Sequence, residues 1–119
     1  MPKGENVSTI SKNNAEHYIW GKNCDGWHLA KSKNLSVIQE RVPGGCFEVR
    51  HIHNKSEQFF FILSGIATIE LDGTDCHLEK NQGLYIPAGV THQLKNRDEE
   101  DLCFLVISTP PSHGDRIEV

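Results

Sequence analysis

His51 and His53 are separated by one residue, and this spacing constrains the fold more than any other feature of the sequence. Successive side chains on a β-strand point to opposite faces, so residues two apart share a face. On a strand, both imidazoles therefore point the same way and can close on one metal ion. A third histidine, His92, follows the turn sequence Pro87-Ala88-Gly89. The sequence thus offers three imidazoles for one metal site.

A fourth ligand is expected from Gln58 or Glu57, which follow His53 after the short polar break 54–56. Neutral imidazole nitrogens together with an amide or carboxylate oxygen suit a divalent transition metal such as Zn, Fe, Mn or Ni. The remaining histidines stand singly in the sequence and are not expected to be ligands: His17, His28, His77 and His113.

This arrangement resembles the two sequence motifs of the cupin superfamily, G(x)5HxH(x)3-4E(x)6G and G(x)5PxG(x)2H(x)3N. The matching positions are Gly45, His51, His53 and Gly65 in the first motif, and Pro87, Gly89, His92 and Asn96 in the second. The resemblance implies an all-β fold, the double-stranded β-helix (jelly-roll) cupin barrel. It also implies a metal centre built from the three motif histidines and a residue at the glutamate position of the first motif.

The chain departs from the first motif at the fourth ligand, because Gln58 stands where the family usually has glutamate. Glu57 lies one residue earlier, at the shorter spacing that the motif also permits. Strand parity separates the two, since neighbouring residues face opposite sides of a sheet. If the register to Gly65 holds, Gln58 points into the barrel and Glu57 points outward. Phe60 and Ile62 then share the inner face with Gln58, which we favour as the ligand, with Glu57 as the alternative.

The rest of the chain has the pattern of an all-β protein. Short apolar segments recur at intervals of roughly 8–12 residues with turn residues between them, as in sandwiches and barrels. The segment 102–107 is apolar on both faces and is expected to be covered on both. Asn81 replaces the glycine that opens the second cupin motif, and we expect Gly83 to make that turn instead.

Length and composition favour one domain over residues 1–119, a size close to the commonest for a domain. Neither an internal repeat nor a linker interrupts the pattern. The polar residues 1–14 are expected to form a flexible arm or a strand exchanged with a partner chain.

Charge and hydropathy narrow the classes of partner. A formal net charge of −4 provides no basic field for nucleic acid or for an anionic membrane. Apolar runs fall well short of the roughly 20 residues of a membrane span, and the polar N-terminus lacks a signal-peptide core. The four cysteines form no CxxC pair. We therefore expect reduced thiols in a cytoplasmic protein.

Three neutral imidazoles and an amide leave nearly the full charge of a divalent ion uncompensated, so the centre is a Lewis acid that favours an anionic or polyhydroxylated ligand. We expect a divalent-metal-binding cupin that acts on a small polar metabolite, with a sugar-isomerase-like, lyase or epimerase activity on a sugar acid or sugar phosphate. The alternatives are a non-catalytic metabolite-binding or sensing cupin and an Fe(II) dioxygenase. No acid–base residue can be assigned from the sequence.

Aromatic residues suggest two further features. Trp20, Trp27 and Tyr85 are candidates for a wall on which a carbohydrate stacks. The run of phenylalanines at 59–61 puts aromatic rings on both faces of one strand, so the outward rings need cover. We expect this cover to come from a second copy in a homodimer.

Overall fold

The computed structural model describes residues 8–119, which form eleven β-strands joined by turns and loops. The strands are β1 (Glu16–Trp20), β2 (Cys24–Lys31), β3 (Ser36–Val42), β4 (His51–His53), β5 (Glu57–Ser64), β6 (Ala67–Leu71), β7 (Thr74–Leu78), β8 (Gly83–Ile86), β9 (His92–Lys95), β10 (Leu102–Thr109) and β11 (Arg116–Glu118). Within residues 8–119 there is no helix that is long and apolar enough to cross a membrane. The predicted all-β class is confirmed.

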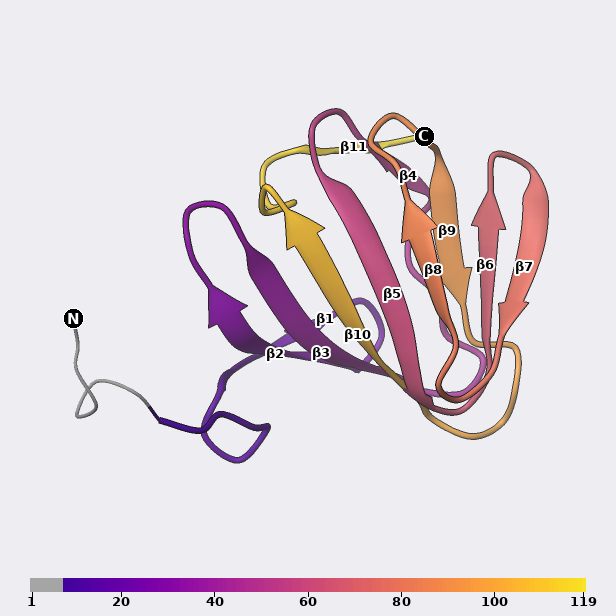
Figure 1. Ribbon diagram of the computed structural model, residues 1–119. Coiled ribbons are helices and arrows are strands. Elements are labelled where there is room, and N and C mark those ends of the chain that lie inside the picture. Colours follow the sequence, from indigo (N-terminus) through magenta and orange to yellow (C-terminus); the bar gives the residue numbers. More distant parts are fainter. Residues whose placement is uncertain (1–7) are drawn as a thin grey trace.

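The strands form two antiparallel sheets packed face to face (Figure 1). Sheet A has the order β1-β2-β3-β10-β5-β8, and sheet B has the order β11-β4-β9-β6-β7. Strands far apart in the chain are neighbours, as where β10 lies between β3 and β5. This pairing is the double-stranded jelly roll that the motifs imply, in which two sheets share one core.

Alternating side chains of both sheets meet in that core. The inward residues of sheet A are buried: Leu102, Phe104 and Val106 from β10, and Phe60 and Ile62 from β5. Sheet B contributes Ile69, Leu78 and Leu94 to the same cluster. Removing this apolar surface from water is the main stabilising term for such a fold.

The outer side of β10 is less buried than its inner side. Cys103, Leu105 and Ile107 point away from the core and are only half-buried. β10 lies between β3 and β5 in the sheet. The outer face of this segment is thus only partly covered within the described residues, and cover on both faces stays a prediction.

Two turns show why particular residues are needed. Gly65 has a φ of +85°, and a Cβ there would lie 2.6 Å from the Asp101 carbonyl oxygen. Asn81 has a φ of +67°, so it makes the turn that opens the second motif. The expectation that Gly83 makes this turn is wrong. Gly83 lies in β8, where its lack of a side chain makes room for the Phe59 ring, 2.3 Å from an added Cβ.

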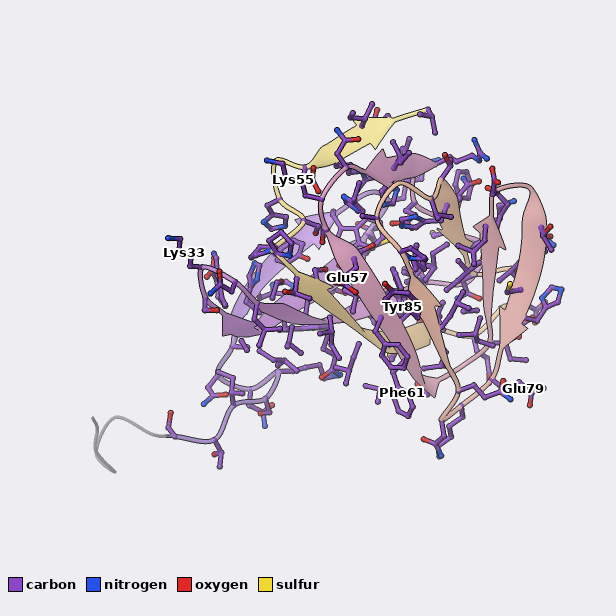
Figure 2. The ribbon with its side chains drawn as sticks, turned by 45° about the horizontal axis from the view of Figure 1, so that its top comes forward. Lys33, Lys55, Glu57, Phe61, Glu79 and Tyr85 are labelled. Atoms are coloured by element: carbon purple, nitrogen blue, oxygen red, sulfur yellow. The ribbon has the colours of Figure 1, made fainter. Side chains whose placement is uncertain are left out.

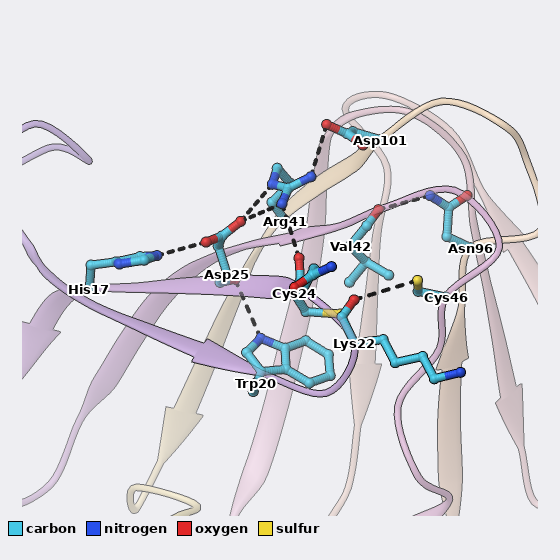
Figure 3. Close-up of polar contacts among 11 residues, drawn as sticks. His17, Trp20, Lys22, Cys24, Asp25, Arg41, Val42, Cys46, Asn96 and Asp101 are labelled. Carbon is cyan, nitrogen blue, oxygen red and sulfur yellow. Dashed lines mark hydrogen bonds and ion pairs between the residues drawn. The ribbon is translucent and has the colours of Figure 1, made fainter.

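A polar network fixes the β1–β2 hairpin to its neighbours (Figure 3). Asp25 of β2 is bonded to His17 Nε2 and accepts from Arg41 Nε, each over 2.7 Å. Arg41 also donates to Asp101, 3.2 Å away, just before β10. The hydrogen bond to His17 and the pairing with Arg41 hold the pKa of Asp25 below its usual value. The hairpin is thereby fixed to β3 and to the start of β10, and its β1 strand supplies one wall of the cavity described below.

The N-terminal arm expected over residues 1–14 lies partly outside the described residues. Residues 12–14 form a turn that is closed by a hydrogen bond from the Ala15 amide to the Ser11 carbonyl over 2.9 Å.

Candidate metal centre

The three motif histidines meet between β4 and β9. His51 and His53 share the inner face of β4, and His51 pairs across the sheet with His92 of β9. One ligand nitrogen from each lies within 4.8 Å of the others, and all three residues are buried. We call this group the histidine cluster.

Backbone carbonyls orient all three imidazoles. Each Nδ1 lies within hydrogen-bond distance of a carbonyl oxygen: His51 at 2.8 Å from Val49, His53 at 2.9 Å from Asp115, and His92 at 3.0 Å from Val90. A carbonyl oxygen only accepts, so each Nδ1 carries the proton and each Nε2 keeps its lone pair. Such partners are the usual way in which a protein fixes metal-ligating histidines.

Burial keeps these imidazoles neutral. It lowers the pKa of His51 to about 3, and it also lowers the pKa values of His53 and His92. Neutral imidazole is the form that coordinates a metal, so the cluster is in its ligand form throughout the physiological range.

Gln58 lies on the inner face of β5 and is buried, as strand parity predicts. Its Nε2 donates to Ser108 Oγ over 3.0 Å, while its Oε1 is buried without a hydrogen-bond partner among the described residues. His92 Nε2 is buried and unpartnered in the same way. Buried polar atoms normally have a hydrogen-bond or metal partner, so Gln58 Oε1 and His92 Nε2 indicate that a ligand binds here. Glu57, in contrast, is exposed and accepts from the Tyr85 hydroxyl over 2.9 Å.

The donor set fits a divalent metal ion. The free Nε2 atoms of the histidine cluster and the free amide oxygen of Gln58 are neutral ligands suited to Zn, Fe, Mn or Ni. Glu57 stands outside this arrangement, on the other face of its strand.

The C-terminal segment completes the surroundings of the centre, a role that the sequence did not reveal. It crosses from the end of β10 to β4, where β11 pairs with the strand of His51 and His53 (Figure 1). The Asp115 carboxylate accepts backbone N–H groups of the 54–56 turn, over 2.9 Å from Lys55 and 2.8 Å from Ser56. Asp115 thus fixes the turn that links β4 to β5 while its own carbonyl orients His53.

A cavity of about 310 Å³ adjoins the centre, and its wall includes His51, His53 and Gln58. Of the aromatic wall expected from the sequence, only Trp20 lines this cavity. Trp27 lies beneath the Lys12 ammonium, 5.1 Å from its ring centre, and Tyr85 is 54% exposed beside Glu57 (Figure 2). The expectation is therefore wrong for Trp27 and Tyr85.

Other cavity residues were missed by the sequence reasoning: Tyr18, Glu40, Glu48 and Arg116. One signal was available for Glu40. It alternates with Ile38 and Val42, both buried, which places a carboxyl group on the inner face of β3.

With this geometry established, comparison with known proteins settles the family. Residues 37–108 match the Cupin domain family. The chain belongs to the cupin family. An uncharacterized protein of Methanocaldococcus jannaschii is 32% identical to this cupin over 89 residues, which cover 74% of this chain and 71% of the relative. The mannose-1-phosphate guanylyltransferase of Escherichia coli is 32% identical over 93 residues, 77% of this chain but only 19% of the enzyme's length.

Solved structures share the fold of this cupin at low sequence identity. KdgF from Halomonas sp. matches with a TM-score of 0.81 and 16% identity. The match covers 90% of this chain and 98% of the KdgF chain. A cupin-superfamily sugar phosphate isomerase from Silicibacter pomeroyi matches with a TM-score of 0.77 and 21% identity. The match covers 87% of this chain and 76% of the isomerase chain.

Proposed function

We propose that this cupin binds one divalent metal ion and acts on a small sugar derivative, either a sugar acid or a sugar phosphate. The metal ligands are the histidine cluster and Gln58. The reaction is an isomerase-like proton transfer next to a carbonyl group, a step that also underlies lyase and epimerase chemistry. The observation that carries this proposal is the meeting of three imidazole nitrogens in the histidine cluster, two of whose residues line the cavity together with Gln58 and its unpartnered amide oxygen.

The residues of the cavity suit such a ligand. A divalent metal held by these neutral donors supplies a Lewis acid that polarises a carbonyl or hydroxyl group. Arg116 lines the same cavity and provides a positive charge for a carboxylate or phosphate. Trp20 adds an aromatic surface beside these polar groups. Anionic and polyhydroxylated compounds are therefore favoured over apolar ones.

The relatives support the same substrate class. One structure with this fold is a sugar phosphate isomerase, and one relative in sequence is a guanylyltransferase for mannose 1-phosphate. The cavity lies at the small end of the roughly 300–1,000 Å³ range of ligand pockets. A single sugar unit matches that size better than an oligosaccharide.

Metal-dependent sugar binding is the expected result of a calorimetric experiment. The purified chain is stripped with a chelator, reloaded separately with Zn, Fe, Mn or Ni, and titrated with glucose 6-phosphate, mannose 1-phosphate and galacturonate. At least one sugar should bind to a loaded form and lose most of its affinity for the stripped form. Failure of every sugar to bind any loaded form would contradict the proposal.

The same preparation separates the other candidate functions. Binding without any chemical change of the sugar, followed by NMR, would favour a carrier or sensor. Consumption of oxygen by the iron form alone would favour a dioxygenase.

We further propose that two copies associate through the outer side of sheet A. This surface carries apolar side chains from four adjacent strands: Val37, Phe59, Phe61, Tyr85, Leu105 and Ile107. Phe59 is 38% exposed and its ring stacks on that of Phe61, 6.4 Å between centres. Figure 2 shows Phe61 and Tyr85 together over β5 and β8. In a two-fold symmetric dimer the same surface of each copy packs against that of the other, so each apolar surface covers its partner.

The mass in solution tests this association. The unmodified chain should have the mass of two chains at micromolar concentration by light scattering, and Phe59→Lys should reduce it to one. Phe47→Lys is the matched control, because Phe47 is 60% exposed but lies outside sheet A. A single-chain mass for the unmodified protein would contradict the dimer.

A further inference from the structure

Two carboxyl groups line the cavity, Glu40 of β3 and Glu48 of the 43–50 segment, and the charge of Glu48 raises the pKa of Glu40. Glu48 accepts the backbone N–H of Leu94 over 3.0 Å, whereas the Glu40 carboxyl group accepts only from the Tyr18 hydroxyl among the described residues. Among residues 8–119, neither forms an ion pair with a lysine, arginine or histidine. Withdrawing a carboxyl group from water without a positively charged partner is unfavourable, and such groups gather at functional sites.

Glu40 belongs to a row of residues that crosses three strands of sheet A. Tyr18 of β1 pairs with Gly26 of β2, and Gly26 pairs in turn with Glu40. The Tyr18 hydroxyl donates to Glu40 Oε2 over 3.1 Å, although the strand of Gly26 lies between them.

Gly26 makes this contact possible. A Cβ at this position would lie 2.2 Å from Tyr18 Cζ and 2.5 Å from its hydroxyl oxygen. The tyrosine ring therefore lies over the bare backbone of Gly26 in order to reach the carboxyl group. An ordinary side chain at position 26 would exclude Tyr18 from this position.

The electrostatic surroundings keep Glu40 partly protonated. Burial and the neighbouring Glu48 raise its pKa to about 8, against the opposing effects of the Tyr18 hydrogen bond and the charge of Arg116. Burial likewise raises the pKa of Glu48 to about 7. The other titratable groups that line the cavity are His51 and His53 of β4 and His113 of the C-terminal segment. The strands that flank β3 present Gly26 and Phe104 opposite Glu40, neither of which is charged.

We propose that Glu40 is the general acid–base residue of this cavity and that Tyr18 positions it. This inference rests on the proposed function, because it supplies the proton transfer of the same reaction. The cavity is small, so a sugar that fills it contacts both the metal-site wall and the wall that holds Glu40. A carboxyl group whose pKa lies near the working pH is present in both of the forms that this role requires.

The step balances without an oxidant or reductant. The Glu40 carboxylate takes a proton from the carbon next to the substrate's carbonyl group. The electron pair of that C–H bond forms a carbon–carbon double bond, and the carbonyl oxygen takes up the negative charge. Return of the proton from Glu40 to carbon restores a carbonyl group and regenerates the carboxylate.

Exchange of substrate hydrogen with solvent tests this step. Metal-loaded protein in D₂O should place deuterium next to the carbonyl group of glucose 6-phosphate or galacturonate, observed by NMR. Glu40→Gln should slow the exchange by about 100-fold or more, the usual scale for loss of a general base. Bound metal and calorimetric sugar affinity should change little in this variant. Equal exchange in Glu40→Gln, or bound sugar without any exchange by the unmodified protein, would overturn the inference.

Titration of Glu40 itself gives a readout that needs no sugar and therefore separates this inference from the proposed function. Carbon-13 NMR of labelled carboxyl groups should show one resonance, absent in Glu40→Gln, with a midpoint near 8. Tyr18→Phe should raise this midpoint, because the hydroxyl stabilises the carboxylate, and Glu48→Gln should lower it by removing a like charge. A Glu40 midpoint in the ordinary range for glutamate, or one that neither variant moves, would overturn the inference even if sugars bind.

Discussion

Replacement of His51, His53 or His92 by alanine is expected to remove most of the bound metal while leaving the barrel folded. Each Nε2 is a direct ligand in the proposed centre, so the loss of affinity should exceed the roughly 10- to 100-fold typical for removal of an outer partner. Metal content by mass spectrometry and the far-ultraviolet circular dichroism spectrum measure the two effects separately. The core persists because it is built from the alternating apolar residues of both sheets.

His77→Ala is the matched control for these variants. His77 lies on β7, bonds to the Thr68 hydroxyl over 3.2 Å and is no part of the histidine cluster. It should keep its metal. Full metal in all three cluster variants would show that the centre lies elsewhere.

The second large effect is expected at Gln58. Gln58→Glu should bind metal about tenfold more tightly, because it places a negative charge beside a divalent ion. Two unit charges about 4 Å apart attract by between roughly 1 and 4 kcal/mol over the range of effective dielectric at such sites. The Ser108 hydroxyl can donate to the new carboxylate, so the local structure should hold. The same variant should weaken binding of anionic sugars, since the net charge of the centre falls by one.

Glu57→Gln is the neighbouring control, and it should leave metal affinity unchanged. Its side chain is exposed and bonded to Tyr85 on the outer face of β5. Competition of each variant with a metal-sensitive dye measures the affinities. Loss of metal in Glu57→Gln together with full metal in Gln58→Ala would mean that the shorter motif spacing supplies the fourth ligand.

The inward-facing residues of β4 and β5 followed from the sequence because they depend on local geometry alone. Alternation with a period of two puts Gln58, Phe60 and Ile62 on one face of β5 whatever the strand pairs with. The same rule gives His51 and His53 a common face. Motif spacing added His92, and the structure brings all three imidazoles together.

Features of single turns were less accessible. The turn before β8 depends on which residue adopts a positive φ, and asparagine tolerates that region well enough to replace glycine. The sequence pattern pointed to Gly83, whereas the backbone turns at Asn81. Trp20 lines the cavity and Trp27 does not. The alternation of side chains along a strand separates these two residues only once the pairing of β1 with β2 is known.

Only the tertiary structure decided what surrounds the metal centre. The carbonyl that orients His53 belongs to Asp115, 62 residues further along the chain, and Tyr18 meets Glu40 across 22 residues. Such contacts depend on the order and register of strands in a sheet, which no local period encodes. The sequence by itself thus determined the fold family and the inward residues that are proposed as metal ligands. The Asp115 carbonyl that orients His53, and the acidic wall that faces the same cavity, exist only because distant strands pair in one register.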